Sequence, residues 1–231
     1  MSDEVRRSAP RPRHFLVEPG NLLIYQQRER ALVACLRRAG VNEATLPQLR
    51  VLEVGCGSGG LLPLLIYYGA SPPLVHGVDL DAIRIQAATK RYPAIGFSVG
   101  DVTRLPFQAG TWDVVVQSTM FTSILEPQAR RAAAREMMRV LTPHGFILWF
   151  DFRYNSPHNN HVRRVTKGEL LRDLFPDAHV YLLRTVLLPP LARLIAPVSW
   201  TLAELLAVIP PLCSHYCALI RPKERAAESG D

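Results

Sequence analysis

The stretch Val51-Leu52-Glu53-Val54-Gly55-Cys56-Gly57-Ser58-Gly59-Gly60 decides the fold of this 231-residue chain. Its first four residues, apolar apart from one acid, predict a short buried strand. The alternating glycines predict a tight turn, because glycine adopts left-handed backbone and lets a ligand lie against the main chain. The apolar residues 61–66 predict a helix, whose first N–H groups we expect to be free for a ligand. Strand, glycine turn and helix together are typical of a nucleotide-cofactor cradle.

Two classes of cofactor fit this turn. The spacing Gly55-x-Gly57-x-x-Gly60 matches the dinucleotide fingerprint, which is a weak signal by itself. Glu53 would be repelled by a pyrophosphate but suits a cationic or amine-bearing ligand. An acid followed by x-Gly-x-Gly-x-Gly resembles the first motif of the class I S-adenosylmethionine-dependent methyltransferases. The resemblance implies S-adenosylmethionine as cofactor and S-adenosylhomocysteine as product, and a nicotinamide or flavin enzyme is the alternative.

Two further acids stand where predicted strands end. Residues 74–79 read as a strand ending in Asp79, at about the spacing from the glycine turn where nucleotide-binding units place a ribose-binding acid. A helix N-cap is the other interpretation, but Asp81 is better placed for that. Residues 97–101 read as the next strand, ending in Asp101.

In the methyltransferase family an acid at the position of Asp101 accepts a hydrogen bond from the adenine amino group, beside a backbone N–H. The resemblance therefore implies adenine contacts for Asp101 and Val102, and a turn aspartate is the alternative. The predicted cofactor-binding residues are Glu53, Gly55, Cys56, Gly57, Gly59, Asp79, Leu80, Asp101, Val102 and Gln117.

The acceptor side is expected at the carboxyl ends of the strands predicted at 112–117 and 146–150, where open α/β sheets bind ligands. The polar, aromatic segment 151–161 follows the second of these. Asp151 and His158 are candidate general bases for a hydroxyl. The predicted acceptor contacts are Phe121, Arg153, Tyr154 and Asn155. The alternative for segment 151–161 is a plain surface loop, and the alternative for Phe121 is a core position. The two histidines of this segment lack a third ligand, so no metal site is predicted.

The remaining pattern predicts helices at 21–38, 82–91, 127–141 and 169–175, a turn at 142–145, and strands at 180–186 and 215–220. The apolar, proline-broken segment 187–212 predicts a helical insertion, with Thr201-x-x-Glu204 as a capping box. It holds no clean run of about 20 apolar residues for a membrane helix. The basic stripe Arg131, Arg135 and Arg139 is expected to be a solvated helix face.

Seven predicted strands, with helices between the first five and a helical insertion between the last two, match the Rossmann-like methyltransferase fold over about residues 46–221. The resemblance implies an α/β protein: a three-layer sandwich with a seven-stranded, mostly parallel sheet whose last strand is antiparallel. We expect one domain over residues 21–222, with flexible tails at 1–20 and 223–231.

Composition narrows the functional classes. With 48% hydrophobic and 20% charged residues the chain is expected to be ordered. The net charge of +7 comes mostly from scattered arginines, so DNA is not an expected partner. Four cysteines without a C-x-x-C pair, and a polar start without a signal peptide, predict a reduced, cytoplasmic protein.

The resemblance implies methyl transfer to a small-molecule acceptor, which we expect to be an oxygen on a sugar or secondary metabolite. The sulfonium is already electrophilic, so alignment of the acceptor is the main task and a diagnostic catalytic residue is not required. The Asn/Asp-Pro-Pro-Tyr/Phe motif for amide or amine acceptors is absent, since residues 117–120 read Gln-Ser-Thr-Met. An RNA or protein acceptor, a non-catalytic cofactor-binding scaffold and a homodimer stay open.

Overall fold

The computed structural model describes residues 16–155, 159 and 161–223. By their contacts the described residues group into two compact units. The helical unit comprises residues 16–30 and 185–214, and the sheet unit comprises residues 31–184 and 215–223. The expected single domain over 21–222 stays a prediction.

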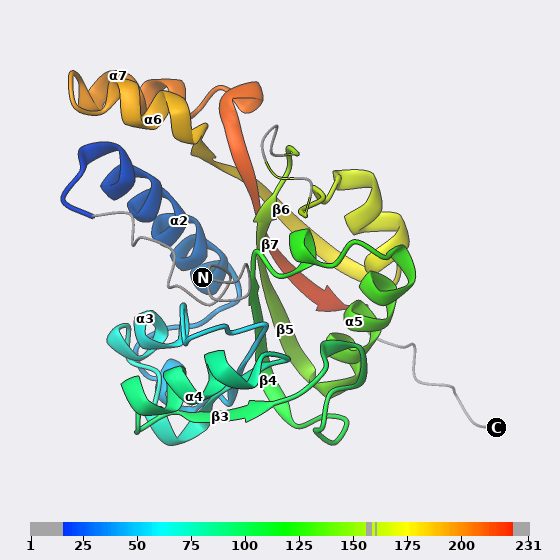
Figure 1. Ribbon diagram of the computed structural model, residues 1–231. Coiled ribbons are helices and arrows are strands. Elements are labelled where there is room, and N and C mark those ends of the chain that lie inside the picture. Colours follow the sequence, from blue (N-terminus) through cyan, green and yellow to red (C-terminus); the bar gives the residue numbers. More distant parts are fainter. Residues whose placement is uncertain (1–15, 156–158, 160, 224–231) are drawn as a thin grey trace, which may run out of the picture. The chain divides into compact units, whose positions relative to one another are not determined.

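A seven-stranded sheet organises the chain, with strand order β3-β2-β1-β4-β5-β7-β6 (Figure 1). Strands β1 to β5 pair in parallel, and β7 pairs with β5 antiparallel. This confirms the predicted mostly parallel sheet with its antiparallel last strand. The strands are β1 Val51–Val54, β2 Val75–Asp79, β3 Gly96–Val99, β4 Trp112–Ser118, β5 Leu141–Phe152, β6 Ala178–Leu187 and β7 Cys213–Pro222.

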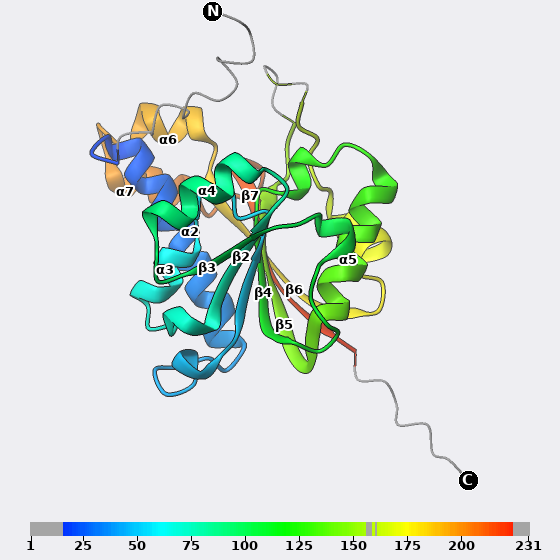
Figure 2. The ribbon, with the colours of Figure 1, turned by 60° about the horizontal axis from the view of Figure 1, so that its bottom comes forward.

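Helices cover both faces of the strands in the sheet unit, with α3 and α4 on one face and α5 on the other (Figure 2). Helix α5 packs through its small and apolar stripe, which includes the fully buried Ala133 and Met137. Asp81 caps α4 as predicted, accepting from the N–H groups of Ile83 and Arg84. The helices are α2 Pro19–Arg38, α3 Leu62–Tyr67, α4 Ala82–Arg91, α5 Pro127–Val140, α6 Pro189–Ile195 and α7 Trp200–Leu206.

The core of the sheet unit lies around its central strands. Leu52 of β1, Val115 of β4 and Ile147 of β5 have no exposed surface. Parallel strands covered on both faces require such continuous apolar runs. The sheet order changes direction between β1 and β4, and the carboxyl ends of strands beside such a switch point are where open α/β sheets bind ligands.

Two local predictions need correction. The predicted turn at 142–145 is assigned to β5, which begins at Leu141, although its register with β4 shifts between Leu141 and Phe146. Helix α7 is capped by Ser199, whose hydroxyl accepts from Leu202 N–H at 3.2 Å. The expected capping box fails because Glu204 bonds to side chains of α2 instead.

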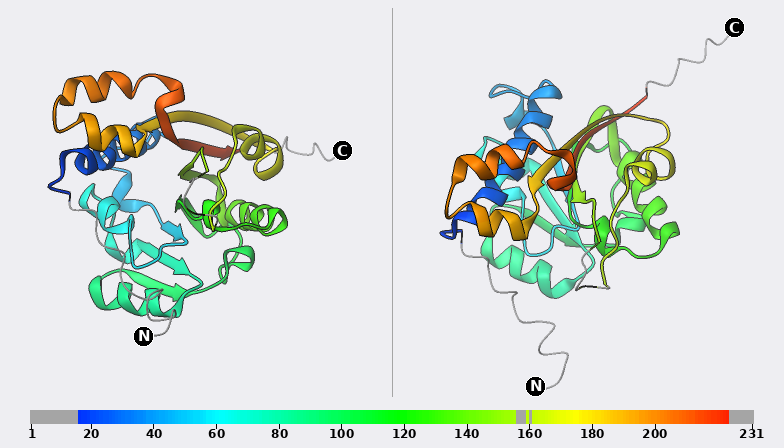
Figure 3. Two further views of the ribbon diagram at one scale, coloured as in Figure 1. Left: turned by 45° about the horizontal axis from the view of Figure 1, so that its top comes forward. Right: turned by 90° about the horizontal axis from the view of Figure 1, so that it is seen from above.

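The helical unit has its own small core, made by Leu23, Leu187, Ala192, Ala196 and Ala203. Helices α6 and α7 follow one another beside the start of α2 (Figure 3). They confirm that the segment predicted as a helical insertion is helical between β6 and β7. No helix in the described part of the chain is long and apolar enough to span a membrane.

Candidate functional site

The glycine turn after β1 has the left-handed backbone that its sequence predicts. Gly55, Gly57 and Gly59 have φ values of 67°, 55° and 84°. The N–H of Gly55 is anchored to the carbonyl of Val78 at 2.8 Å. A Cβ at Gly55 would lie 2.6 Å from the Met120 side chain, whereas a Cβ at Gly57 would meet nothing within 4 Å. The main chain at Gly57 therefore faces open space, as a cofactor cradle requires.

Asp79 ends β2 directly beside this turn. Its Oδ2 accepts the N–H of Gly57 at 2.8 Å, and its Oδ1 accepts the N–H of Asp81 at 3.0 Å. Each carboxylate oxygen has a second lone pair, so both can still accept a hydroxyl. The structure thus brings together two of the predicted cofactor residues, and Asp79 also fixes the turn.

The other predicted acid, Asp101, ends the loop after β3 and is exposed. Its Oδ1 accepts both the N–H and the hydroxyl of Thr103 at 2.8 Å. Val102 begins the short 3-10 turn Val102–Arg104 and packs partly on the core. Leu80, next to Asp79, is exposed. The contacts of Asp101 and Val102 with adenine, and of Asp79 with the ribose, therefore stay predictions.

Glu53 has a structural role beside its predicted cofactor contact, which stays a prediction. Its carboxylate is buried, and its Oε2 accepts from the N–H groups of Leu61 and Leu62 at 3.3 and 3.2 Å. These are the first donors at the start of α3, so the N–H groups predicted to be free for a ligand are bonded within the chain. Glu53 therefore anchors the start of the helix behind the glycine turn.

Three other predicted contacts lie in the interior. Gln117 is fully buried, donating to the carbonyl of Phe150 at 3.2 Å and accepting the N–H of Met120 at 3.1 Å. Phe121 is fully buried with its ring centroid 4.1 Å from that of Trp149. Ligand contacts do not fit these two residues, because neither has exposed surface. Cys56 is buried too, and its burial raises the pKa of its thiol.

The segment after β5 is held by contacts with its own neighbours. The guanidinium of Arg153 lies 4.8 Å from the ring centroid of Tyr154 and 5.3 Å from that of Tyr216. The side-chain oxygen of Asn155 accepts the N–H of Arg164 at 2.9 Å. His158 lies outside the described residues, so its catalytic role stays a prediction. Within the described ranges no three ligating side chains gather as a metal site would require.

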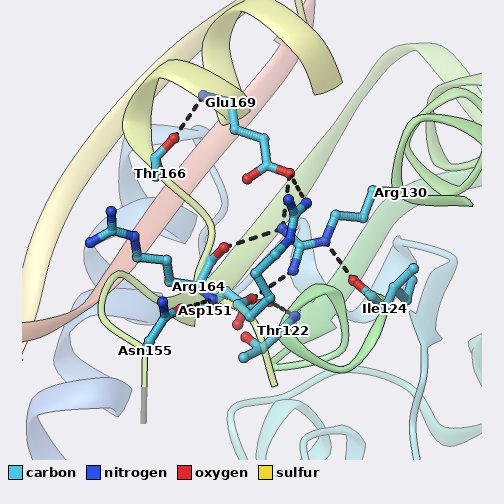
Figure 4. A network of polar contacts seen from close by, with 9 residues as sticks. Thr122, Ile124, Arg130, Asp151, Asn155, Arg164, Thr166 and Glu169 are labelled. Atoms are coloured by element: carbon cyan, nitrogen blue, oxygen red, sulfur yellow. Dashed lines mark hydrogen bonds and ion pairs between the residues drawn. The ribbon is translucent and has the colours of Figure 1, made fainter. Parts of the chain in front are cut away.

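A buried arginine that the sequence reading missed organises this region (Figure 4). Arg130 of α5 has no exposed side-chain surface, and its Nε donates to the carbonyl of Ile124 at 2.6 Å. Its Nη2 donates to the carbonyl of Arg163 at 2.6 Å. Its Nη1 donates to the carbonyl of Arg164 at 3.2 Å and to Glu169 at 2.8 Å. Arg130 therefore joins the loop after β4 to the segment after β5.

Helical spacing offered a signal for Arg130. It precedes the buried Ala133, Ala134 and Met137 by three, four and seven residues, which places it on the core-facing stripe of α5. Arg139, which belongs to the basic stripe predicted to be a solvated face, is exposed and is also bonded, to Glu136 and to the carbonyl of Leu105.

Asp151 belongs to the same buried region as Arg130. It has no exposed surface, its Oδ2 accepts the N–H of Thr122 at 3.2 Å, and its Oδ1 accepts the N–H of Phe152 at 2.8 Å. Burial raises the pKa of Asp151 to about 7. The two N–H bonds and the positive charge of Arg130 lower this pKa, but by less than burial raises it. A general base must reach the proton that it removes. The predicted base role does not fit Asp151, which instead holds the loop after β4.

Asp151→Asn is expected to change the pH dependence of stability. The native state holds a proton on Asp151 up to about pH 7, whereas an unfolded aspartate releases it near pH 3.9. Stability linked to this proton is therefore full below about pH 4 and is lost as pH rises toward 7. Asparagine cannot titrate, so the wild type should lose about 2 kcal/mol relative to the variant between pH 5 and pH 7.

Urea denaturation of both proteins at several pH values measures this difference. The variant itself should be less stable at low pH, by about 1–3 kcal/mol, because its single amide oxygen replaces two acceptors. Parallel stability curves for the two proteins from pH 5 to pH 7 would show that Asp151 is already ionised in the native state.

Comparison with known proteins agrees with this geometry. Residues 51–145 match a family model described as a methyltransferase domain. A demethylmenaquinone methyltransferase of Renibacterium salmoninarum is 30% identical over 174 residues, which cover 68% of this chain and 68% of that protein. A phthiotriol/phenolphthiotriol dimycocerosates methyltransferase of Mycobacterium ulcerans is 37% identical over 144 residues. That match covers 56% of this chain and 52% of the relative, so the chain spans about half of that protein.

Solved structures share the fold. A TehB-like S-adenosylmethionine-dependent methyltransferase from Corynebacterium glutamicum aligns with a TM-score of 0.56 at 20% identity, over 86% of this chain and 96% of that one. An S-adenosylmethionine-dependent methyltransferase from Mesorhizobium loti aligns with a TM-score of 0.57 at 18% identity, over 83% of this chain and 97% of that one. The glycine turn, the strand order and the sequence relatives lead to one conclusion. The chain belongs to the class I S-adenosylmethionine-dependent methyltransferases.

Proposed function

We propose that this protein transfers the methyl group of S-adenosylmethionine to an oxygen of a small, apolar acceptor. The observation that carries the proposal is the open glycine turn held against Asp79 at the carboxyl edge of the sheet. When bound, S-adenosylmethionine supplies an electrophilic methyl group on its sulfonium.

The residues present fit that cofactor. The open main chain at Gly57 accommodates a ligand without a side chain in the way. The two oxygens of Asp79 match the two neighbouring hydroxyls of a ribose. Asp101 is exposed to accept from an adenine amino group, with the backbone of Val102 beside it. These roles for Asp79, Asp101 and Val102 are part of the proposal.

The chain contributes alignment more than acid–base chemistry. Asp151 is buried behind the loop after β4 and holds that loop in place. Arg130 ties the same loop to the segment after β5. Rigid positioning of an acceptor is worth a large part of the barrier when the methyl donor is already reactive.

The names of the relatives direct the choice of acceptor. One acts on phthiotriol or phenolphthiotriol dimycocerosates and another on demethylmenaquinone, which are a lipid and a quinone. A lipid-like secondary metabolite is therefore favoured over a sugar for this protein. RNA and protein acceptors have no such support.

An acceptor panel tests the proposal. The full chain is incubated with S-adenosylmethionine and, separately, with lipid-soluble phenols, quinols, sugars and RNA, and S-adenosylhomocysteine release is followed. We expect turnover with the lipid-soluble hydroxyl compounds alone. Turnover on RNA or sugars alone would refute the acceptor class, and S-adenosylhomocysteine binding without turnover on any acceptor would favour a scaffold.

A further inference from the structure

Helices α6 and α7 expose large apolar side chains on the side away from their core. Their small residues Ala192, Ala196 and Ala203 are buried in the helical unit. The exposed large apolar residues of these helices and of the turns after them form a set that we call the apolar face: Leu194, Val198, Leu202, Leu205, Val208 and Ile209. Exposure reaches 70% for Leu194 and 86% for Val198.

The apolar face follows the two helices and the turns after them. Leu202 and Leu205 are three residues apart, so they share one side of α7, and Val208 and Ile209 follow in the turn after it. Leu194 lies in α6, and Val198 lies in the turn after that helix. Single exposed apolar residues need no explanation, but six of them within residues 194–209 are unusual for a surface and indicate an interaction site.

The charges of this segment are turned toward α2. Residues 189–212 contain two charged residues, Arg193 and Glu204. Arg193 Nε donates to the side chain of Asn21 at 3.0 Å. Glu204 accepts from Gln27 at 3.2 Å and pairs with Arg30. Both charges are thus engaged within the helical unit, which leaves the apolar face itself uncharged.

Basic sequence adjoins exposed apolar residues of the same unit. Leu16 and Val17, just before α2, are exposed. The fifteen residues that precede them in the sequence carry four arginines and two acids. Apolar side chains next to an excess of arginines are complementary to a bilayer surface with anionic headgroups, where each basic residue adds to the attraction.

We propose that the helical unit docks on an anionic lipid bilayer through the apolar face, with the arginine-rich residues before Leu16 adding electrostatic attraction. This inference rests on the proposed function and deepens it, because an apolar acceptor would reside in a bilayer. The docking itself needs neither cofactor nor acceptor, so it can be tested separately.

Vesicle flotation of the full chain tests the docking. Wild type should bind vesicles of phosphatidylcholine and phosphatidylglycerol in equal parts, more weakly at high salt and on phosphatidylcholine alone. Leu194→Asp/Leu205→Asp should lower the vesicle affinity about tenfold or more, because two charged groups replace apolar side chains at the contact. Ile83→Asp on α4 is the matched control: Ile83 is 70% exposed, as Leu194 is, and its variant should bind like wild type.

S-adenosylhomocysteine affinity, measured on the same samples, separates the two proposals. Wild type that binds S-adenosylhomocysteine but floats with neither kind of vesicle overturns the docking and leaves the proposed function intact. Equal vesicle binding by wild type and the double variant overturns the role of the apolar face. A wild-type dimer that the double variant abolishes, without vesicle binding, would assign the face to a second copy and also overturn the proposal.

Discussion

Arg130→Met is expected to lower the free energy of unfolding by about 3–5 kcal/mol, because buried acceptors lose a charged donor at about 1–3 kcal/mol each. Glu169 would lose the guanidinium that lies 2.8 Å from its Oε1 and keep that of Arg163, which lies 2.7 Å from the same oxygen. The carbonyls of Ile124, Arg163 and Arg164 would lose a donor at the same time. Methionine fills a similar volume, so the loss reports on polar contacts more than on a cavity. Urea denaturation gives the number.

Arg131→Met is the control for this prediction. Arg131 is the next residue on α5 but is exposed, so its variant should stay within about 0.5 kcal/mol of wild type. Arg130→Lys should fall between wild type and Arg130→Met, since lysine keeps the charge but not the fork of donors. Equal stability of the Arg130→Met and Arg131→Met variants would mean that the network does not hold the two loops together.

Asp79→Asn is expected to weaken S-adenosylhomocysteine binding by about 10- to 100-fold. Hydrogen bonds to a charged acceptor are worth about 1.5–3 kcal/mol each, and asparagine offers one neutral oxygen in place of two. Stability should also fall by about 1 kcal/mol, because the N–H groups of Gly57 and Asp81 both bond to this carboxylate. Calorimetric titration measures the affinity, and denaturation measures the stability.

Asp81→Asn is the matched control for the Asp79 prediction. Asp81 is two residues away and caps α4, and asparagine is about as good an N-cap as aspartate. Its variant should therefore keep both stability and affinity. If Asp79→Asn and Asp81→Asn bind S-adenosylhomocysteine equally well, Asp79 does not contact the cofactor.

The sheet was predictable because each of its signals is local. Apolar runs such as Val51–Val54, glycines that require positive φ, and the cap at Asp81 depend on neighbours along the chain. Strand ends could be read to within a few residues. The largest difference concerns the start of β5, where residues 142–145 were predicted as a turn. Leu141 already pairs with Trp112 of β4, and the register shifts before Phe146 pairs with Val114, so the strand begins earlier than its turn-like sequence indicates.

The site was predictable only in part, because burial depends on residues far apart in sequence. Asp79 and Gly57 meet as their motif implies. Glu53 and Asp151 also stand at strand ends, but backbone N–H groups of Leu62 and Thr122 take up their oxygens. A strand-end acid by itself does not reveal whether it faces ligand or anchors a loop.

Titration of the purified protein with S-adenosylhomocysteine, with NAD⁺ as the control, tests the central claim most directly. An open glycine turn beside Asp79 predicts saturable binding of S-adenosylhomocysteine and none of NAD⁺ at the same concentrations. Binding of NAD⁺ alone, or of neither ligand by a protein that is folded, would contradict it.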